Sequence, residues 1–167
     1  SGGSIVVADS ATDHSRLWLA PGLLGSGFDR YDINGHGGLD VADGTTLTVR
    51  APRLRLRDRA GDAASATEAM ETWLPPLYAA DVGSGAIQQR GGASVLLRSQ
   101  RTTDGGDVRI GRNASVTVDP GQSIELRGAG NITVEGRLTA RGGSILLDDV
   151  RTATQTYQAT GSDLQYR

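Results

Sequence analysis

An arginine occupies every second position of one short segment, residues 53–59. On a β-strand, residues two apart point to the same face, so Arg53, Arg55, Arg57 and Arg59 would form one row with neighbours about 7 Å apart. Guanidinium groups pair bidentately with sulfate and phosphate. The row is therefore a candidate contact for a glycan or another polyanion. The alternative is a solvated face, whose like charges discourage pairing between strand edges.

A second group of polar residues has the spacing of a calcium-binding loop. Its members fall at positions 1, 3, 5, 6, 9 and 12 of that register: Asp32, Asn34, His36, Gly37, Asp40 and Asp43. The last position prefers a bidentate glutamate, and the sequence predicts no flanking helices. Turns rich in Asn, Asp and Gly account for the same residues, so we predict no metal site.

The remaining residues do not form a pattern typical of catalysis. His14 and His36 are the two histidines, no spacing pairs them as ligands, and there is no cysteine. The sequence contains neither a nucleophile elbow nor a P-loop. Asp148 and Asp149 are adjacent, so on a strand they would point to opposite faces. We therefore predict no catalytic residue, no cofactor and no enzymatic activity.

Aliphatic residues recur every eight positions in the C-terminal third of the chain. Two such sets are Val108, Val116, Ile124 and Ile132, and Ile110, Val118, Leu126 and Val134. Polar residues alternate with them, which predicts short strands with one buried face. Two folds fit this spacing: an antiparallel sandwich or barrel, and a parallel β-helix with coils of about 24 residues. The β-helix would place Val108 beneath Ile132 and Val116 beneath Ala140.

Internal repetition favours the second fold. A Gly-Gly pair precedes an aliphatic run in residues 2–7, 91–97 and 142–147, as expected for stacked coils. The stretch 62–73 is rich in Ala, and Ser65 with Glu68 has the spacing of a capping box. We therefore predict an all-β protein, a parallel β-helix segment, with an antiparallel β-sandwich as the alternative. Its predicted parts are coils in 1–59 and 91–150, a helical or loop insert in 60–90, and a polar loop or truncated strand in 151–167.

Composition indicates which side chains can form the core and which classes of partner are not expected. The chain has 167 residues, of which 24 are Gly and 4% are aromatic, so the core must use aliphatic side chains. The net charge of −2 predicts neither nucleic acid nor an anionic membrane as a partner. No apolar stretch approaches the roughly 18 residues that span a bilayer, so we predict no membrane insertion.

Several phrases, in their order along the chain, carry a family resemblance. They are 17–21 (LWLAP), 27–31 (GFDRY), 38–45 (GLDVADGT), 106–111 (GDVRIG), 118–121 (VDPG), 132–136 (ITVEG) and 138–145 (LTARGGSI). The chain resembles the C-terminal passenger region of filamentous-haemagglutinin-like exoproteins of the two-partner secretion pathway. The resemblance implies a right-handed parallel β-helix, secreted or held at the bacterial cell surface, that serves as an adhesin or as the stalk of a contact-dependent toxin.

The predicted function is that of a structural and adhesive rod module in a large secreted bacterial surface protein. The resemblance implies an outer-membrane transporter as partner, acting through a domain outside this chain. It also implies a glycan or a receptor on a host or neighbouring cell. We expect the chain to be an internal piece of a longer protein. The alternatives are a polysaccharide-processing β-helix enzyme and a β-sandwich glycan-binding module.

Overall fold

The computed structural model describes residues 3–11, 15–100 and 105–150, and most of these lie in or between short strands. The strands are β1 (Ile5–Val7), β2 (Leu17–Leu19), β3 (Arg30–Gly35), β4 (Leu39–Val41), β5 (Thr46–Val49), β6 (Arg53–Leu56), β7 (Met70–Trp73), β8 (Tyr78–Ala80), β9 (Ile87–Gln89), β10 (Ser94–Ser99), β11 (Val108–Ile110), β12 (Ser115–Val118), β13 (Ser123–Gly128), β14 (Ile132–Val134), β15 (Arg137–Thr139) and β16 (Ser144–Asp149). The helical elements are η1 (Pro21–Gly25), η2 (Ala60–Asp62) and α1 (Ala66–Ala69). The predicted all-β class is confirmed.

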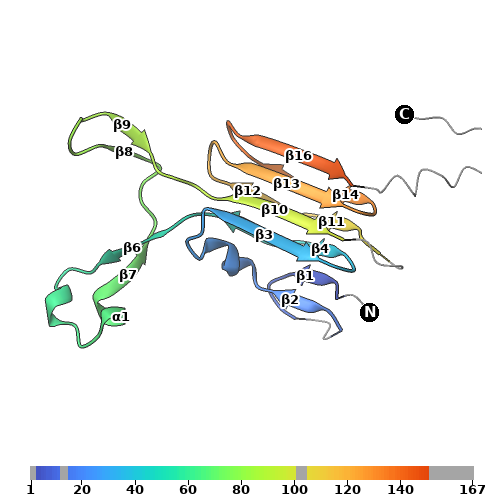
Figure 1. The fold of residues 1–167 in the computed structure, drawn as a ribbon, viewed down its shortest axis with the longest axis horizontal. Helices are drawn as coiled ribbons and strands as arrows, with labels where there is room; N and C mark the ends of the chain where they lie inside the picture. Colours follow the sequence, from blue (N-terminus) through green and yellow to red (C-terminus); the bar gives the residue numbers. More distant parts are fainter. Residues whose placement is uncertain (1–2, 12–14, 101–104, 151–167) are drawn as a thin grey trace, which may run out of the picture.

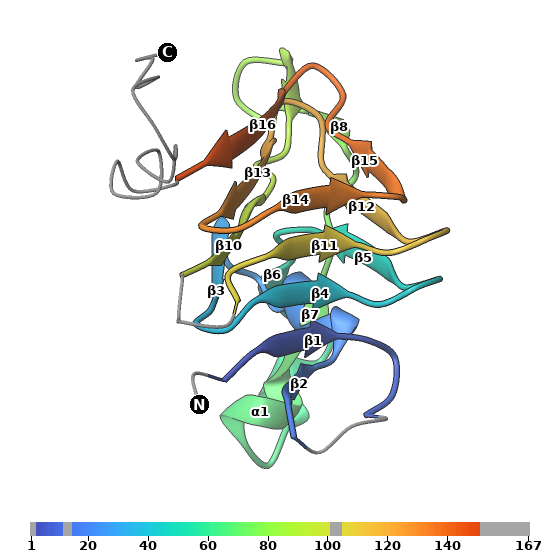
Figure 2. The ribbon, with the colours of Figure 1, turned by 90° about the vertical axis from the view of Figure 1, so that its right-hand side faces the viewer.

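Three sheets, in which every pair of strands is parallel, form the body of the protein. Sheet A has the order β14-β11-β4-β1-β2, sheet B the order β16-β13-β10-β3 and sheet C the order β15-β12-β5. The chain passes through sheets B, A and C in turn, first as β3, β4 and β5, then as β10–β12, and then as β13–β15. Figure 2 shows these passages stacked, with β4, β11 and β14 following one another upward, β1 and β2 below them and β16 near the top. Within these three passages, strands that follow one another in the sequence lie in different sheets, and each pairs in parallel with strands of other passages, so the antiparallel sandwich is wrong for these strands.

The stacking register confirms one predicted pair and corrects another. Val108 lies beside Ile132, as the eight-residue spacing predicts. Val116, however, lies beside Leu138 and not beside Ala140. Residues 111–114 connect β11 to β12, whereas only residues 135–136 connect β14 to β15. The shorter connection lacks the turn in which Asn113 has a φ of 56°. The chain therefore reaches sheet C earlier than a uniform repeat would allow.

The interior between the sheets is aliphatic, as the composition requires. Sheet A contributes Val41 and Ile110, sheet B Ile124 and sheet C Leu47 and Val116, each fully buried. Ile132 is only half-buried against this core, because β14 is the outermost strand of sheet A in the described residues.

The repeated Gly-Gly pair has a steric cause at the corner before β16. Gly142 has a φ of +62°, a backbone conformation that residues with a Cβ adopt at a cost. A Cβ on Gly143 would collide with the backbone carbonyl of Gln122 in the passage below. A Cβ on Gly92, in the second copy of the pair, would lie 2.7 Å from the Cβ of Asp119. The pairs thus allow a tight turn and close stacking.

An insert separates β5 from β10, and it consists mainly of two antiparallel hairpins. Strand β6 pairs with β7, and β8 pairs with β9. Both hairpins project to one side of the stacked sheets (Figure 1). The insert begins soon after Val49, so the prediction that residues 53–59 belong to the coils is wrong. Within 60–90, where we predicted a helix or loop, the chain forms the strands β7, β8 and β9 as well as the short helical elements η2 and α1 and the turns between them.

The predicted capping box lies at the start of α1. Ser65 Oγ accepts a hydrogen bond from the Glu68 amide at 3.2 Å. The Glu68 carboxylate accepts a second bond from the amide of Ala64 at 2.9 Å. The segment 151–167, predicted to be a polar loop or truncated strand, lies outside the described residues. Across the ranges that the structure describes, no helix has the length and apolar character needed to cross a membrane.

Candidate functional site

Only part of the predicted arginine row lies on a strand. Arg53 and Arg55 lie on β6, but the strand ends at Leu56, and Arg59 has a φ of 67° at the start of η2. The alternation in the sequence extends further than the strand because the chain turns to enter the hairpin with β7. The strand thus carries Arg53 and Arg55 of the predicted row, whereas Arg57 and Arg59 follow its end, and a role of this segment in binding stays a prediction.

Two arginines of this segment have partners within the hairpin. Arg55 Nε donates to Glu71 Oε1 at 2.6 Å, and its guanidinium carbon lies 5.0 Å from the ring centroid of Trp73. Arg57 Nε donates to the carbonyl of Met70 at 3.2 Å. These contacts hold β6 against β7, which indicates a structural role for both side chains.

The residues of the calcium register are divided between two sheets. Asp32 lies on β3 in sheet B and accepts a hydrogen bond from Arg98 Nε at 2.8 Å. Asp40 and Asp43 lie at sheet A, where both accept hydrogen bonds from Arg109. Within the part of the chain that the structure describes, no group of three or more His, Cys, Asp or Glu residues could hold a metal ion. His14 lies outside this part.

Arg109 is the centre of an ion-pair network on the outer side of sheet A. It lies 3.1 Å from Asp40, 2.5 Å from Asp43 and 2.9 Å from Glu135. A second guanidinium, that of Arg112, lies 3.1 Å from Glu135. The network joins three successive passages of the chain, because β4, β11 and the turn after β14 each contribute to it.

This network sets the charge state of its acidic members. The hydrogen bond from Arg109 holds the pKa of Asp43 below its ordinary value, and the hydrogen bond from Arg112 does the same to the pKa of Glu135. The three carboxylates raise the pKa of Arg109 further above neutrality. Asp43 and Glu135 therefore stay ionised further into the acid range than free carboxyl groups, which favours their pairing with guanidinium.

Sheet C carries a groove that the sequence analysis did not identify. The groove encloses about 480 Å³ on the outer side of the sheet and reaches Leu77 of the insert. Thr48, Thr117 and Thr139 lie side by side in the register of the three strands and line the groove. Arg50, Arg137 and Arg141 line it as well.

The signal for this groove was present in the sequence. The phrases 46–50 (TLTVR), 115–119 (SVTVD) and 137–141 (RLTAR) have the same alternation, with aliphatic residues at the second and fourth positions. The aliphatic residues point inward, so the first, third and fifth positions point outward. These outward positions carry hydroxyl groups and charges in all three phrases. Only the alignment of the three strands shows that they share one surface.

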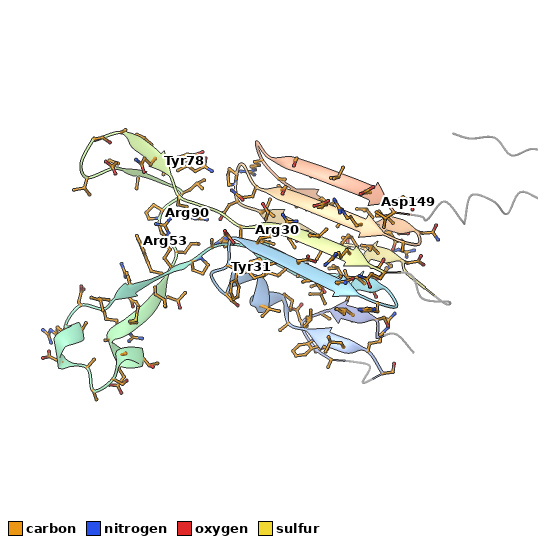
Figure 3. The ribbon with its side chains drawn as sticks, viewed as in Figure 1. Arg30, Tyr31, Arg53, Tyr78, Arg90 and Asp149 are labelled. Atoms are coloured by element: carbon orange, nitrogen blue, oxygen red, sulfur yellow. The ribbon has the colours of Figure 1, made fainter. Side chains whose placement is uncertain are left out.

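A buried ion pair holds the insert beside this groove. Arg90 follows β9, and its guanidinium donates to Asp119 Oδ1 at 2.5 Å and to the carbonyl of Pro75 at 2.9 Å. Each of the two charged side chains is 9% exposed. Gln89 adds a hydrogen bond to the carbonyl of Pro120 at 2.6 Å. Figure 3 shows Arg90 where the second hairpin joins the sheets.

Comparison with known proteins identifies no relative: no family, no curated protein and no solved structure matches this chain. The class that the structure itself defines is an all-β protein built on parallel sheets, with a two-hairpin insert.

Proposed function

We propose that this chain is a structural and adhesive rod module of a large secreted bacterial surface protein, similar to filamentous haemagglutinins and folded as a right-handed parallel β-helix. The observation that carries the proposal is the in-register parallel stacking of successive passages in three sheets. In such an arrangement each passage contacts its neighbours, so added passages lengthen the protein without enlarging its core. Repeated addition of such passages would therefore produce a stiff rod.

The outer surface supports the same proposal. Ion pairs cross from one passage to the next on sheet A, through Arg109, and on sheet B, where Arg98 pairs with Asp32 and Arg127 with Asp148. Pairs between exposed groups each add little stability, but they match the charges of adjacent passages. Arg98 and Arg127 lie side by side in the register of sheet B, and each of these like charges has an acidic partner on the other neighbouring strand. The transporter would act on a part of the protein outside this chain, and the ligand would bind on an outer face.

Surface location can be tested on intact cells of the organism that encodes the chain. Antibodies raised against residues 1–167 are expected to label unpermeabilised cells or to detect the protein in the culture medium, since a rod of this kind works outside the cell. Treatment of the cells with protease should remove the cell-bound label. An antibody against a cytoplasmic protein serves as the control for lysis. Detection of the chain only after lysis would contradict the proposal.

A further inference from the structure

The outer groove of sheet C has the chemistry of a binding site. Its central column consists of the half-buried side chains of Thr48, Thr117 and Thr139, one from each stacked strand. Neighbouring strands of a sheet lie about 4.8 Å apart, so the hydroxyl groups recur at that interval along the stack. Each hydroxyl can both donate and accept a hydrogen bond, as the hydroxyls of a sugar can. The column therefore offers complementary partners for a hydroxylated chain that lies along the stack.

Three arginines give the groove its charge. Arg50, Arg137 and Arg141 are exposed, and their side chains make no ion pair or hydrogen bond with any residue that the structure describes. The acidic residue of the groove, Asp119, is already paired with Arg90. The groove is thus locally positive although the chain carries a net charge of −2. At physiological salt, charges more than about 8 Å away are largely screened, so a ligand responds to this local charge.

We propose that this groove binds an acidic polysaccharide, with the arginines pairing to its carboxylate or sulfate groups and the threonines bonding to its hydroxyls. Guanidinium forms strong bidentate hydrogen bonds with either anion, so the shared chemistry is that of a polyanionic sugar chain. The lining contains no aromatic side chain. Single-stranded nucleic acid binds on aromatic side chains that stack with its bases, so the lining favours a sugar over a single-stranded nucleic acid. Duplex DNA is held through its phosphates, so it is compared directly in the test.

The inference rests on the proposed adhesive function, for which it supplies the class of ligand. The test measures binding of the chain 1–167 to heparin, to polygalacturonate, to neutral dextran and to duplex DNA at low salt. We expect binding to heparin or polygalacturonate, and the preference between them identifies sulfate or carboxylate as the recognised group. Dextran should not bind, and the affinity for the acidic sugar should fall as salt increases.

Variants assign the binding to the groove. Substituting Arg137→Ala together with Arg141→Ala should weaken binding by about tenfold for each arginine, as expected when a charged hydrogen bond is lost. Thr117→Val, which keeps the shape of the side chain, should weaken binding by roughly threefold. The control removes the same number of charges elsewhere, with Arg16→Ala and Arg98→Ala, and should leave the affinity nearly unchanged. Melting temperatures identify any variant that has lost its fold.

Four outcomes would overturn the proposal. The first three are no binding of either acidic sugar by the parent chain, equal losses of affinity in the groove and control variants, and equal affinity for duplex DNA. The fourth is a loss of affinity when Arg53→Ala and Arg57→Ala are combined, with no loss in the groove variant. That result would assign the binding to the segment 53–59. None of these outcomes changes the labelling of intact cells, so failure of this site is distinguishable from failure of the proposed function.

Discussion

Substituting Ile124 with alanine is expected to lower the free energy of unfolding by about 2–5 kcal/mol. Ile124 is fully buried on β13, between Val95 of β10 and Ile145 of β16. Alanine would leave a cavity that the neighbouring strands cannot fill without losing their register. Ile132→Ala should cost less, because that side chain is only half-buried at the outermost strand of sheet A.

Urea unfolding measured by circular dichroism gives these free energies. The control is Ile87→Ala on β9, where the isoleucine is 71% exposed and should contribute little. Equal unfolding midpoints for Ile124→Ala and for the parent chain would show that the interior between the three sheets is not the core of the protein.

Breaking the ion pair between Arg90 and Asp119 is expected to have the second large effect. Substituting Asp119→Ala leaves the guanidinium of Arg90 buried without its counter-charge, a change that costs about 3–5 kcal/mol at buried sites. Because Arg90 also bonds to Pro75, the loss should release the second hairpin from the sheets. Faster proteolytic cleavage within residues 77–90 would report that release separately from global unfolding.

A double substitution tests whether the two groups act as a pair. Arg90→Met combined with Asp119→Leu should be less destabilising than the sum of the two single changes, because neither charge is then left alone. The exposed pair of Arg98 and Asp32 is the matched control, and its loss should cost about 0–1 kcal/mol. Strictly additive effects at Arg90 and Asp119 would mean that the pair does not anchor the insert.

The sequence predicts the stacking of strands better than the lengths of the connections between them. The eight-residue spacing places Val108 beside Ile132 correctly, because the chain from one to the other is three eight-residue repeats long. It fails for Val116, where a shorter connection brings Leu138 into the neighbouring position. Alternation within a strand reports which face is buried, but it carries no information on the length of the next turn.

Because alternation does not report where the next turn lies, it also predicts the candidate sites incompletely. Alternation in residues 53–59 identifies a strand, but it does not show that β6 pairs with β7 and ends at Leu56. The groove on sheet C has a stronger signal, the repeated outward hydroxyl in the phrases around Thr48, Thr117 and Thr139. That signal becomes a site only when the register brings three distant strands together, and the register depends on the connections.

Both the rod and the groove depend on the parallel stacking of successive passages in the register that the structure shows. The chain has no cysteine, so a pair of introduced cysteines reports that register directly. Thr117 and Thr139 are partners on adjacent strands, about 4.8 Å apart, which lies within the span of a disulfide. We expect the variant with Thr117→Cys and Thr139→Cys to form an intramolecular disulfide under mild oxidation, and the variant with Thr117→Cys and Arg141→Cys to stay reduced. Preferential formation of the disulfide in the second variant would contradict this register, and so would the absence of a disulfide in both variants.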